Sequence, residues 1–125
     1  MISGAKHVPP PPYELQKEIA EMMRFYNENR ETMHPVELAS EMHQRLVYIH
    51  PFTDGNGRTS RLLMNLILLK HGYPIAILKG DAENRLKYYT ALETASIKKD
   101  LTPFKTLISE VVTQTLKKIL NTVKS

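Results

Sequence analysis

Residues 50–61 bring together side chains that could carry out chemistry on a phosphorylated ligand. The segment reads HPFTDGNGRTSR, so a histidine, a carboxylate, a glycine-flanked asparagine and two arginines follow one another closely. An imidazole with a pKa of about 6.5 can accept a proton from an attacking hydroxyl near neutral pH. His50 is therefore the candidate general base, and a structural histidine is the alternative.

The Gly55-Asn56-Gly57 turn is typical of a backbone that binds phosphate. Glycine permits positive φ and close approach of a ligand, so successive N–H groups can point into one concavity. If a helix begins here, its free amides and positive dipole end also favour an anion. Arg58 and Arg61 would lie at the start of that helix, where two cations are unfavourable unless a polyphosphate binds. A plain turn with two surface arginines is the alternative.

Asp54 directly precedes this turn. Mg²⁺ prefers one or two protein oxygens together with phosphate oxygens, so a carboxylate beside a phosphate site is a candidate metal ligand. The metal would bridge two phosphates and neutralise charge on the leaving group. Asp-Gly is also a common turn pair, which is the structural alternative. We expect Phe52 to anchor the loop on the core, and no P-loop sequence is present.

Helical spacing of apolar residues predicts an all-α domain that positions this segment. The predicted helices cover residues 13–29, 35–49, 57–71, 82–98 and from 102 onward. Pro35 suits a first helical turn, and Pro51 disfavours helix at the residue before it, so the second helix should present His50 at its end. The third helix is apolar on nearly every side and should lie buried at the centre of the fold.

The remaining elements support the same domain. Asp81 should cap the fourth helix, whose inward residues we expect to be Leu86, Tyr89 and Leu92. The fifth helix carries one long apolar stripe, made of Phe104, Leu107, Ile108, Val111, Leu116, Ile119 and Val123. His43, on the second helix, is expected to be packed or hydrogen-bonded in the interior.

Length and composition fit one globular domain. The chain has 125 residues, of which 42% are hydrophobic and 24% charged, and it has no cysteine for disulfides or thiolate metal sites. It has neither a membrane-spanning run nor a secretory signal, so we expect no membrane partner and a cytoplasmic location. The net charge of +4 suits an anionic ligand, although many of the lysines near the C-terminus fit solvated helix faces.

Residues 50–61 match the signature of Fic-domain proteins, H-P-F-x-[DE]-G-N-G-R-x-x-R, at every specified position. The chain therefore resembles the Fic/DOC family. The likeness extends from His34-Pro35 to Gly72-Tyr73-Pro74, with weaker similarity at Tyr88-Tyr89 and in residues 7–12. It implies a single Fic-type helical bundle over residues 1–125 around a buried central helix. Residues 1–12 would be a partial flap and proline-rich segment, and residues 13–125 the helical core.

The resemblance implies a protein adenylyltransferase. Such an enzyme transfers AMP from ATP to a Ser, Thr or Tyr hydroxyl of a target protein, itself included, and releases pyrophosphate. His50 would be the general base and Asp54 the Mg²⁺ ligand. The implied phosphate- and nucleotide-binding residues are Gly55, Asn56, Gly57, Arg58 and Arg61. The implied adenine pocket comprises Tyr88, Tyr89 and Ser96, and the implied target-binding flap comprises Lys6, His7 and Val8.

Other functions stay open at this stage. A related Fic transferase could move phosphate, as Doc proteins do, or another nucleotide; Doc-like members have lysine where Gly57 stands, which favours AMP here. A basic helical nucleic-acid-binding module would bind with a steep salt dependence, but it gives His50 and Asp54 no role. A catalytically silent interaction domain is disfavoured because the motif is intact.

Many family members carry an inhibitory motif, [ST]-x-x-x-E-[GN], which this sequence lacks. We expect that the inhibitory helix is absent from this chain, either because the chain is a fragment or because a separate antitoxin-like protein supplies it. The chain as given should therefore be unrestrained. Removal of AMP, which uses the inhibitory glutamate in relatives, is disfavoured for the same reason.

Overall fold

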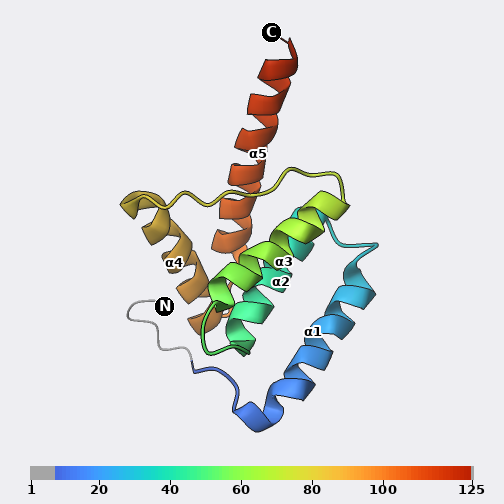
Figure 1. Ribbon diagram of the computed structural model, residues 1–125, viewed down its shortest axis with the longest axis vertical. Helices are drawn as coiled ribbons and strands as arrows, with labels where there is room; N and C mark the ends of the chain where they lie inside the picture. The colour runs from blue at the N-terminus through green and yellow to red at the C-terminus, as the bar shows by residue number, and fades with distance from the viewer. Residues whose placement is uncertain (1–7, 125) are drawn as a thin grey trace.

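The computed structural model describes residues 8–124, and the regular structure in this part of the chain is entirely helical. The elements, in chain order, are η1 (Pro12–Glu14), α1 (Leu15–Asn29), α2 (Pro35–Ile49), α3 (Asn56–Lys70), α4 (Ala82–Ile97) and α5 (Thr102–Lys124). Figure 1 shows their arrangement. The all-α prediction is confirmed, and the helices lie at nearly the predicted bounds. None of the described helices has the length and apolar character needed to cross a bilayer.

The helix ends follow local sequence chemistry. Pro35 is the first residue of α2, and the His34 Nδ1 atom accepts a hydrogen bond from the Val36 amide at 3.1 Å. Asp81 caps α4, as predicted, because its carboxylate accepts from the Asn84 amide at 3.3 Å. A short loop, residues 50–55, joins α2 to α3 and makes the two helices a hairpin. The end of α2 and the start of α3 therefore determine which residues of the 50–61 segment lie in the loop and which lie in a helix.

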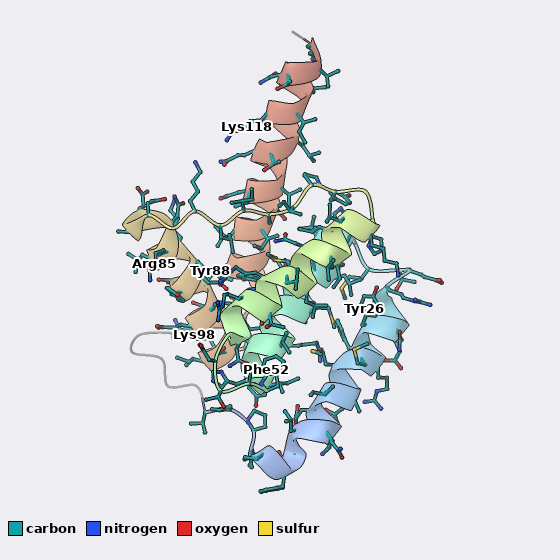
Figure 2. All side chains as sticks on the ribbon, in the orientation of Figure 1. Tyr26, Phe52, Arg85, Tyr88, Lys98 and Lys118 are labelled. Atoms are coloured by element: carbon teal, nitrogen blue, oxygen red, sulfur yellow. The ribbon has the colours of Figure 1, made fainter. Side chains whose placement is uncertain are left out.

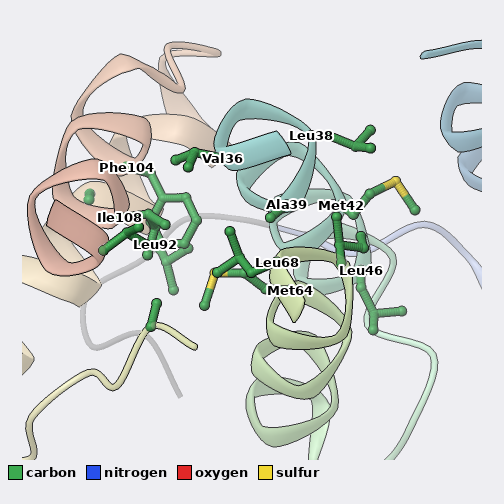
Figure 3. Packing of buried hydrophobic residues seen from close by; sticks show 14 of the residues in the cluster. Val36, Leu38, Ala39, Met42, Leu46, Met64, Leu68, Leu92, Phe104 and Ile108 are labelled. Atoms are coloured by element: carbon green, nitrogen blue, oxygen red, sulfur yellow. The ribbon is translucent and has the colours of Figure 1, made fainter. Parts of the chain in front are cut away.

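The central helix of the fold is α2, which packs against α1, α3, α4 and α5. Figure 3 shows side chains of α2 meeting Met64 and Leu68 of α3, Leu92 of α4, and Phe104 and Ile108 of α5. The prediction that the third helix is buried on nearly every side is wrong. Leu62, Leu66 and Leu69 are 60%, 55% and 56% exposed. Because α3 covers only one side of α2, its outer leucines face solvent.

Two further expectations need correction. Leu86 is exposed rather than inward, because α4 buries the face that carries Tyr88, Leu92 and Ala95 instead. The apolar stripe of α5 is buried only in its first half, around Phe104. The second half of α5 extends beyond the other helices (Figure 1), which leaves the stripe from Leu116 onward exposed.

Candidate functional site

His50 lies at the junction between α2 and the loop that follows it, and its side chain is exposed. Its backbone is left-handed, with φ 53° and ψ 57°, while its amide donates to the Leu46 carbonyl at 3.0 Å. A non-glycine residue in this conformation costs roughly 1–2 kcal/mol. The imidazole therefore stands at a turn that glycine would occupy more easily, which is a common property of functional positions.

The Asn56 side chain holds the loop in place. Its Oδ1 accepts from the Phe52 amide at 3.0 Å, and its Nδ2 donates to the Phe52 carbonyl at 2.7 Å. Asn56 is buried, whereas about half of the Phe52 side chain is exposed. The expectation that the Phe52 ring anchors the loop is therefore wrong: the amide of Asn56 makes the anchor. What Asn56 offers a ligand is its backbone N–H.

We expect Asn56→Ala to destabilise the protein by about 1–3 kcal/mol, because two part-buried hydrogen bonds disappear and the Phe52 backbone groups lose their partner. Asn65→Ala is a matched control, since Asn65 makes the same two-sided contact with the Ala76 backbone, away from the motif. Thermal unfolding measures both losses. Amide hydrogen exchange at Phe52 should accelerate in the Asn56 variant only; equal exchange in the two would contradict this role.

The N-terminus of α3 is open to a ligand. Gly55 precedes it with φ 82°, and no side chain caps the helix. The amides of Asn56, Gly57 and Arg58 have no intrahelical acceptor, as in any first helical turn. By contrast, side chains cap α2 and α4. The predicted helix start is thus confirmed, and its free amides form a site suited to an anion.

Asp54 and Arg58 flank this site on the surface. Their side chains are 94% and 76% exposed, and Asp54 Oδ2 lies 3.8 Å from Arg58 Nη2. Asp54 Oδ1 accepts from the Gly55 amide at 2.8 Å, while Oδ2 makes only the 3.8 Å contact with Arg58 and faces solvent. Among residues 8–124 no group of three or more His, Cys, Asp or Glu could enclose a metal. A cation at Asp54 would take most of its ligands from water and nucleotide, as Mg²⁺ commonly does.

Arg61 is in a different environment from Arg58. Its guanidinium carbon lies 5.9 Å from the centroid of the Tyr88 ring, and its Nη1 donates to the Tyr88 hydroxyl at 3.4 Å. A Cβ added at Gly57 would come within 3.2 Å of the same nitrogen. In the described part of the chain, no carboxylate forms an ion pair with Arg61. Its positive charge is thus held in place without being neutralised.

Behind Arg61, Tyr88 and His43 form a buried polar pair. The Tyr88 hydroxyl lies 2.9 Å from His43 Nε2, and the rings meet edge-on at 5.7 Å. Phe104 packs against both rings, with its centroid 4.7 Å from that of His43 and 6.1 Å from that of Tyr88. Burial, together with the charge of Arg61, lowers the pKa of His43 to about 3. His43 is therefore neutral, and the prediction that it is an interior histidine is confirmed.

The residues implied for the adenine pocket lie mainly inside the bundle. Tyr88 and Ser96 are buried, and the Ser96 hydroxyl accepts from Gln44 Nε2 at 2.9 Å. Tyr89 is half-buried, with its ring 5.2 Å from that of Tyr88. The structure brings Arg61 and Tyr88 together but gives Ser96 a partner on α2. The adenine pocket stays a prediction.

Other predicted positions are placed as follows. Val8 is exposed at the start of the described chain, and Lys6 and His7 lie outside the described residues. A surface cavity of about 390 Å³ lies between α1, α2 and the end of α4, lined by residues such as Glu18, Arg45 and Lys99. It includes none of the predicted site residues.

The sequence matches the model of the Fic/DOC family over residues 1–68. It is also 44% identical over 111 residues to proteins named "Protein adenylyltransferase Fic" from Drosophila sechellia and Drosophila melanogaster. These alignments cover 88% of this chain and 22% of each relative. The chain thus spans about a fifth of the length of these curated relatives.

Solved structures agree on the fold. A Fic-1 fragment from C. elegans superposes with a TM-score of 0.83 at 36% identity, covering 93% of this chain and 34% of the fragment. A Fic domain-containing signaling protein from Bacteroides thetaiotaomicron gives a TM-score of 0.80 at 28% identity, covering 94% of this chain and 50% of that one.

Proposed function

Because this chain belongs to the Fic/DOC family, we propose that it is a protein adenylyltransferase that uses ATP and Mg²⁺. The observation that carries the proposal is the open N-terminus of α3, which begins two residues after Asp54 and six after His50 and carries Arg61 about one and a half turns into the helix. A carboxylate, free amides and a cation, following one another in the chain, suit a nucleoside triphosphate. The name of the Drosophila relatives, protein adenylyltransferase, supports the choice of AMP as the transferred group.

In the proposed reaction His50 takes the proton from a Ser, Thr or Tyr hydroxyl of the target protein. The hydroxyl oxygen then attacks the α-phosphorus of ATP, the bond to the bridging oxygen breaks, and pyrophosphate leaves. The amides at the start of α3 and the guanidinium groups of Arg58 and Arg61 stabilise the charge that develops. Asp54 would hold Mg²⁺, which when bound neutralises charge between the phosphates.

The proposal extends to partners and location. The protein substrate presents an accessible hydroxyl, and the chain itself can serve as one. An inhibitory helix or a separate antitoxin-like protein would restrain the enzyme. As part of the same proposal, the enzyme acts in the cytoplasm, which fractionation of cells would check.

Labelled ATP tests this function. The protein is incubated with Mg²⁺, a protein extract and ATP labelled at either the α- or the γ-phosphate. We expect protein label from the α-phosphate only. Label from the γ-phosphate would instead indicate phosphate transfer, and no label from either would reject both transferase functions. A steep salt dependence of DNA or RNA binding, without label, would favour the nucleic-acid-binding alternative.

Gly57 offers a test of the phosphate site that separates stability from function. We expect Gly57→Ala to stabilise the protein by about 0.5–1 kcal/mol, because alanine is the better helix former. The new Cβ would lie 3.2 Å from Arg61 Nη1, so the flexible guanidinium would shift by a few tenths of an ångström from its place beside the phosphate site. AMP transfer should therefore fall about three- to tenfold. In Gly80→Ala the added Cβ meets nothing within 4 Å, so it is the control; equal activity in the two variants would contradict the prediction.

A further inference from the structure

We infer that Tyr88 and His43 are positioning residues that orient the Arg61 guanidinium for the outer phosphates of a bound nucleoside triphosphate. The identity of the anion rests on the proposed function. The positioning itself rests on the hydrogen bonds that link α3, α4 and α2. Neither Tyr88 nor His43 needs to touch the reacting atoms.

Side chains alone bridge α3 and α4 at this point. No Cα atom of α3 lies within 8 Å of a Cα atom of α4, although each helix packs on α2. Arg61 extends from α3 and Tyr88 from α4, and their side chains meet between the two helices. Figure 2 shows Tyr88 on the side of α4 that faces α5 and α3. Without the Tyr88 hydroxyl, Arg61 would have no described polar partner in α4.

The order of the hydrogen bonds follows from the donors available. The Arg61 guanidinium can only donate, so the Tyr88 oxygen accepts from it. The Tyr88 proton then needs an acceptor, and Nε2 of the neutral His43 imidazole, at 2.9 Å, accepts it in the tautomer that carries the ring proton on Nδ1. The His43 side chain, on α2, is fully buried against Tyr88 of α4 and Phe104 of α5, so it holds the phenol in one orientation. The result is a series of two hydrogen bonds that connects Arg61, through Tyr88, to His43 in the core.

A neutral partner suits a residue that must bind an anion. Arg58 has a carboxylate, Asp54, at 3.8 Å, whereas Arg61 has only a hydroxyl at 3.4 Å. A carboxylate would orient Arg61 but would also neutralise it and compete with phosphate. A hydroxyl orients the guanidinium and leaves its charge for the ligand. The 3.4 Å contact is long for a hydrogen bond, so it restricts the orientation of the guanidinium without holding it rigidly.

Tyr88→Phe is the direct test, because it removes the hydroxyl and keeps the ring in its packing. We expect affinity for ATP with Mg²⁺, measured by calorimetry, to fall about three- to tenfold. Affinity for AMP should not change, because AMP lacks the outer phosphates. In an Arg61→Ala background, Tyr88→Phe should have no further effect on ATP binding, since the hydroxyl acts through that guanidinium.

Tyr73→Phe is the matched control. Tyr73 also pairs with a histidine, since its hydroxyl lies 3.5 Å from His34 Nε2, but this pair lies at the other end of the α2–α3 hairpin. We expect Tyr73→Phe to leave ATP affinity unchanged. His43→Gln is the second variant, and it should weaken ATP binding less than Tyr88→Phe does, because the hydroxyl remains beside Arg61.

Several results would overturn the inference. They are an unchanged ATP affinity in Tyr88→Phe, an equal loss for AMP, or a loss that adds to that of Arg61→Ala. An equal loss for AMP would instead favour direct contact of Tyr88 with adenine. The proposed function fails separately: if ATP binds with the expected coupling but no α-label reaches protein, the positioning role stands and adenylyl transfer does not.

Discussion

Replacing His50 with glycine is expected to abolish AMP transfer and, relative to alanine, to make the folded protein more stable. Loss of a general base costs about 10²–10⁴-fold in rate. The left-handed backbone at His50 costs roughly 1–2 kcal/mol for any residue with a Cβ, and glycine avoids this cost. Part of that gain is offset because glycine loses more conformational entropy than alanine on folding. We therefore expect the free energy of unfolding of the His50→Gly variant to be about 0.5–1 kcal/mol higher than that of the His50→Ala variant.

The two variants control for each other. Both lack the imidazole, so α-label transfer should be lost equally in both, while the midpoint of thermal unfolding should be about 2–5 °C higher for glycine. The exposed imidazole has no described hydrogen bond, so little packing is lost in either case. Retained transfer in both variants would remove His50 from the mechanism. A glycine variant no more stable than the alanine variant would show that the turn is unstrained.

The ends of the helices could be predicted because they depend on local chemistry. Pro35, Pro51, Gly55 and Asp81 act on the backbone within a few residues of themselves, and the structure places helix ends beside each of them. For the same reason the candidate site could be predicted along the sequence. Its parts are consecutive, and the start of α3 brings them together without tertiary packing.

The identity of the central helix could not be predicted, because the sequence gives apolar content but not which face is covered. The α3 helix is rich in leucine, yet Leu62 and Leu66 face solvent. The α2 helix carries Ser40 and His43, which look polar in sequence but are fully buried. Ser40 donates to the Val36 carbonyl at 2.8 Å, and His43 pairs with Tyr88. Burial of a polar residue depends on such partners, and partners on distant segments do not appear in a local pattern.

The link from Arg61 to His43 is of the same kind. It requires α4 to pack on α2 so that Tyr88 stands between the other two side chains. Nothing in the spacing of residues 61 and 88 indicates this. The motif therefore supplies the chemistry, while residues outside it fix one arginine in place, and only the fold connects them.

Lowering the pH from 7 to 5 is expected to destabilise the protein by about 2 kcal/mol through His43 alone. Its pKa is about 3 in the folded protein, against 6.5 when it is not perturbed. Between these values the unfolded chain binds a proton that the folded protein excludes, so stability falls as the pH falls. The contribution of His43 is complete above pH 6.5 and is lost progressively toward pH 3, with a ceiling of about 5 kcal/mol.

The physical cause of this sensitivity lies in what surrounds the imidazole. Arg61 approaches from α3 with a positive charge, Tyr88 from α4 offers a hydroxyl, and Phe104 from α5 offers only an apolar ring. No described carboxylate forms an ion pair with His43, so a proton there would be buried beside another cation.

Denaturant unfolding at pH 7 and pH 5 measures the effect in the wild type and in His43→Gln. Glutamine does not titrate, so the variant should lose about 2 kcal/mol less than the wild type over this range, whatever its stability at pH 7. Carboxylates contribute equally to both proteins and cancel in the difference. Proton NMR gives an independent measurement, in which the His43 ring signals should not titrate between pH 7 and 5. A His43 that titrates near pH 6.5, or equal losses in the two proteins, would mean that the imidazole is hydrated in solution. In that case it could not hold the Tyr88 hydroxyl against Arg61.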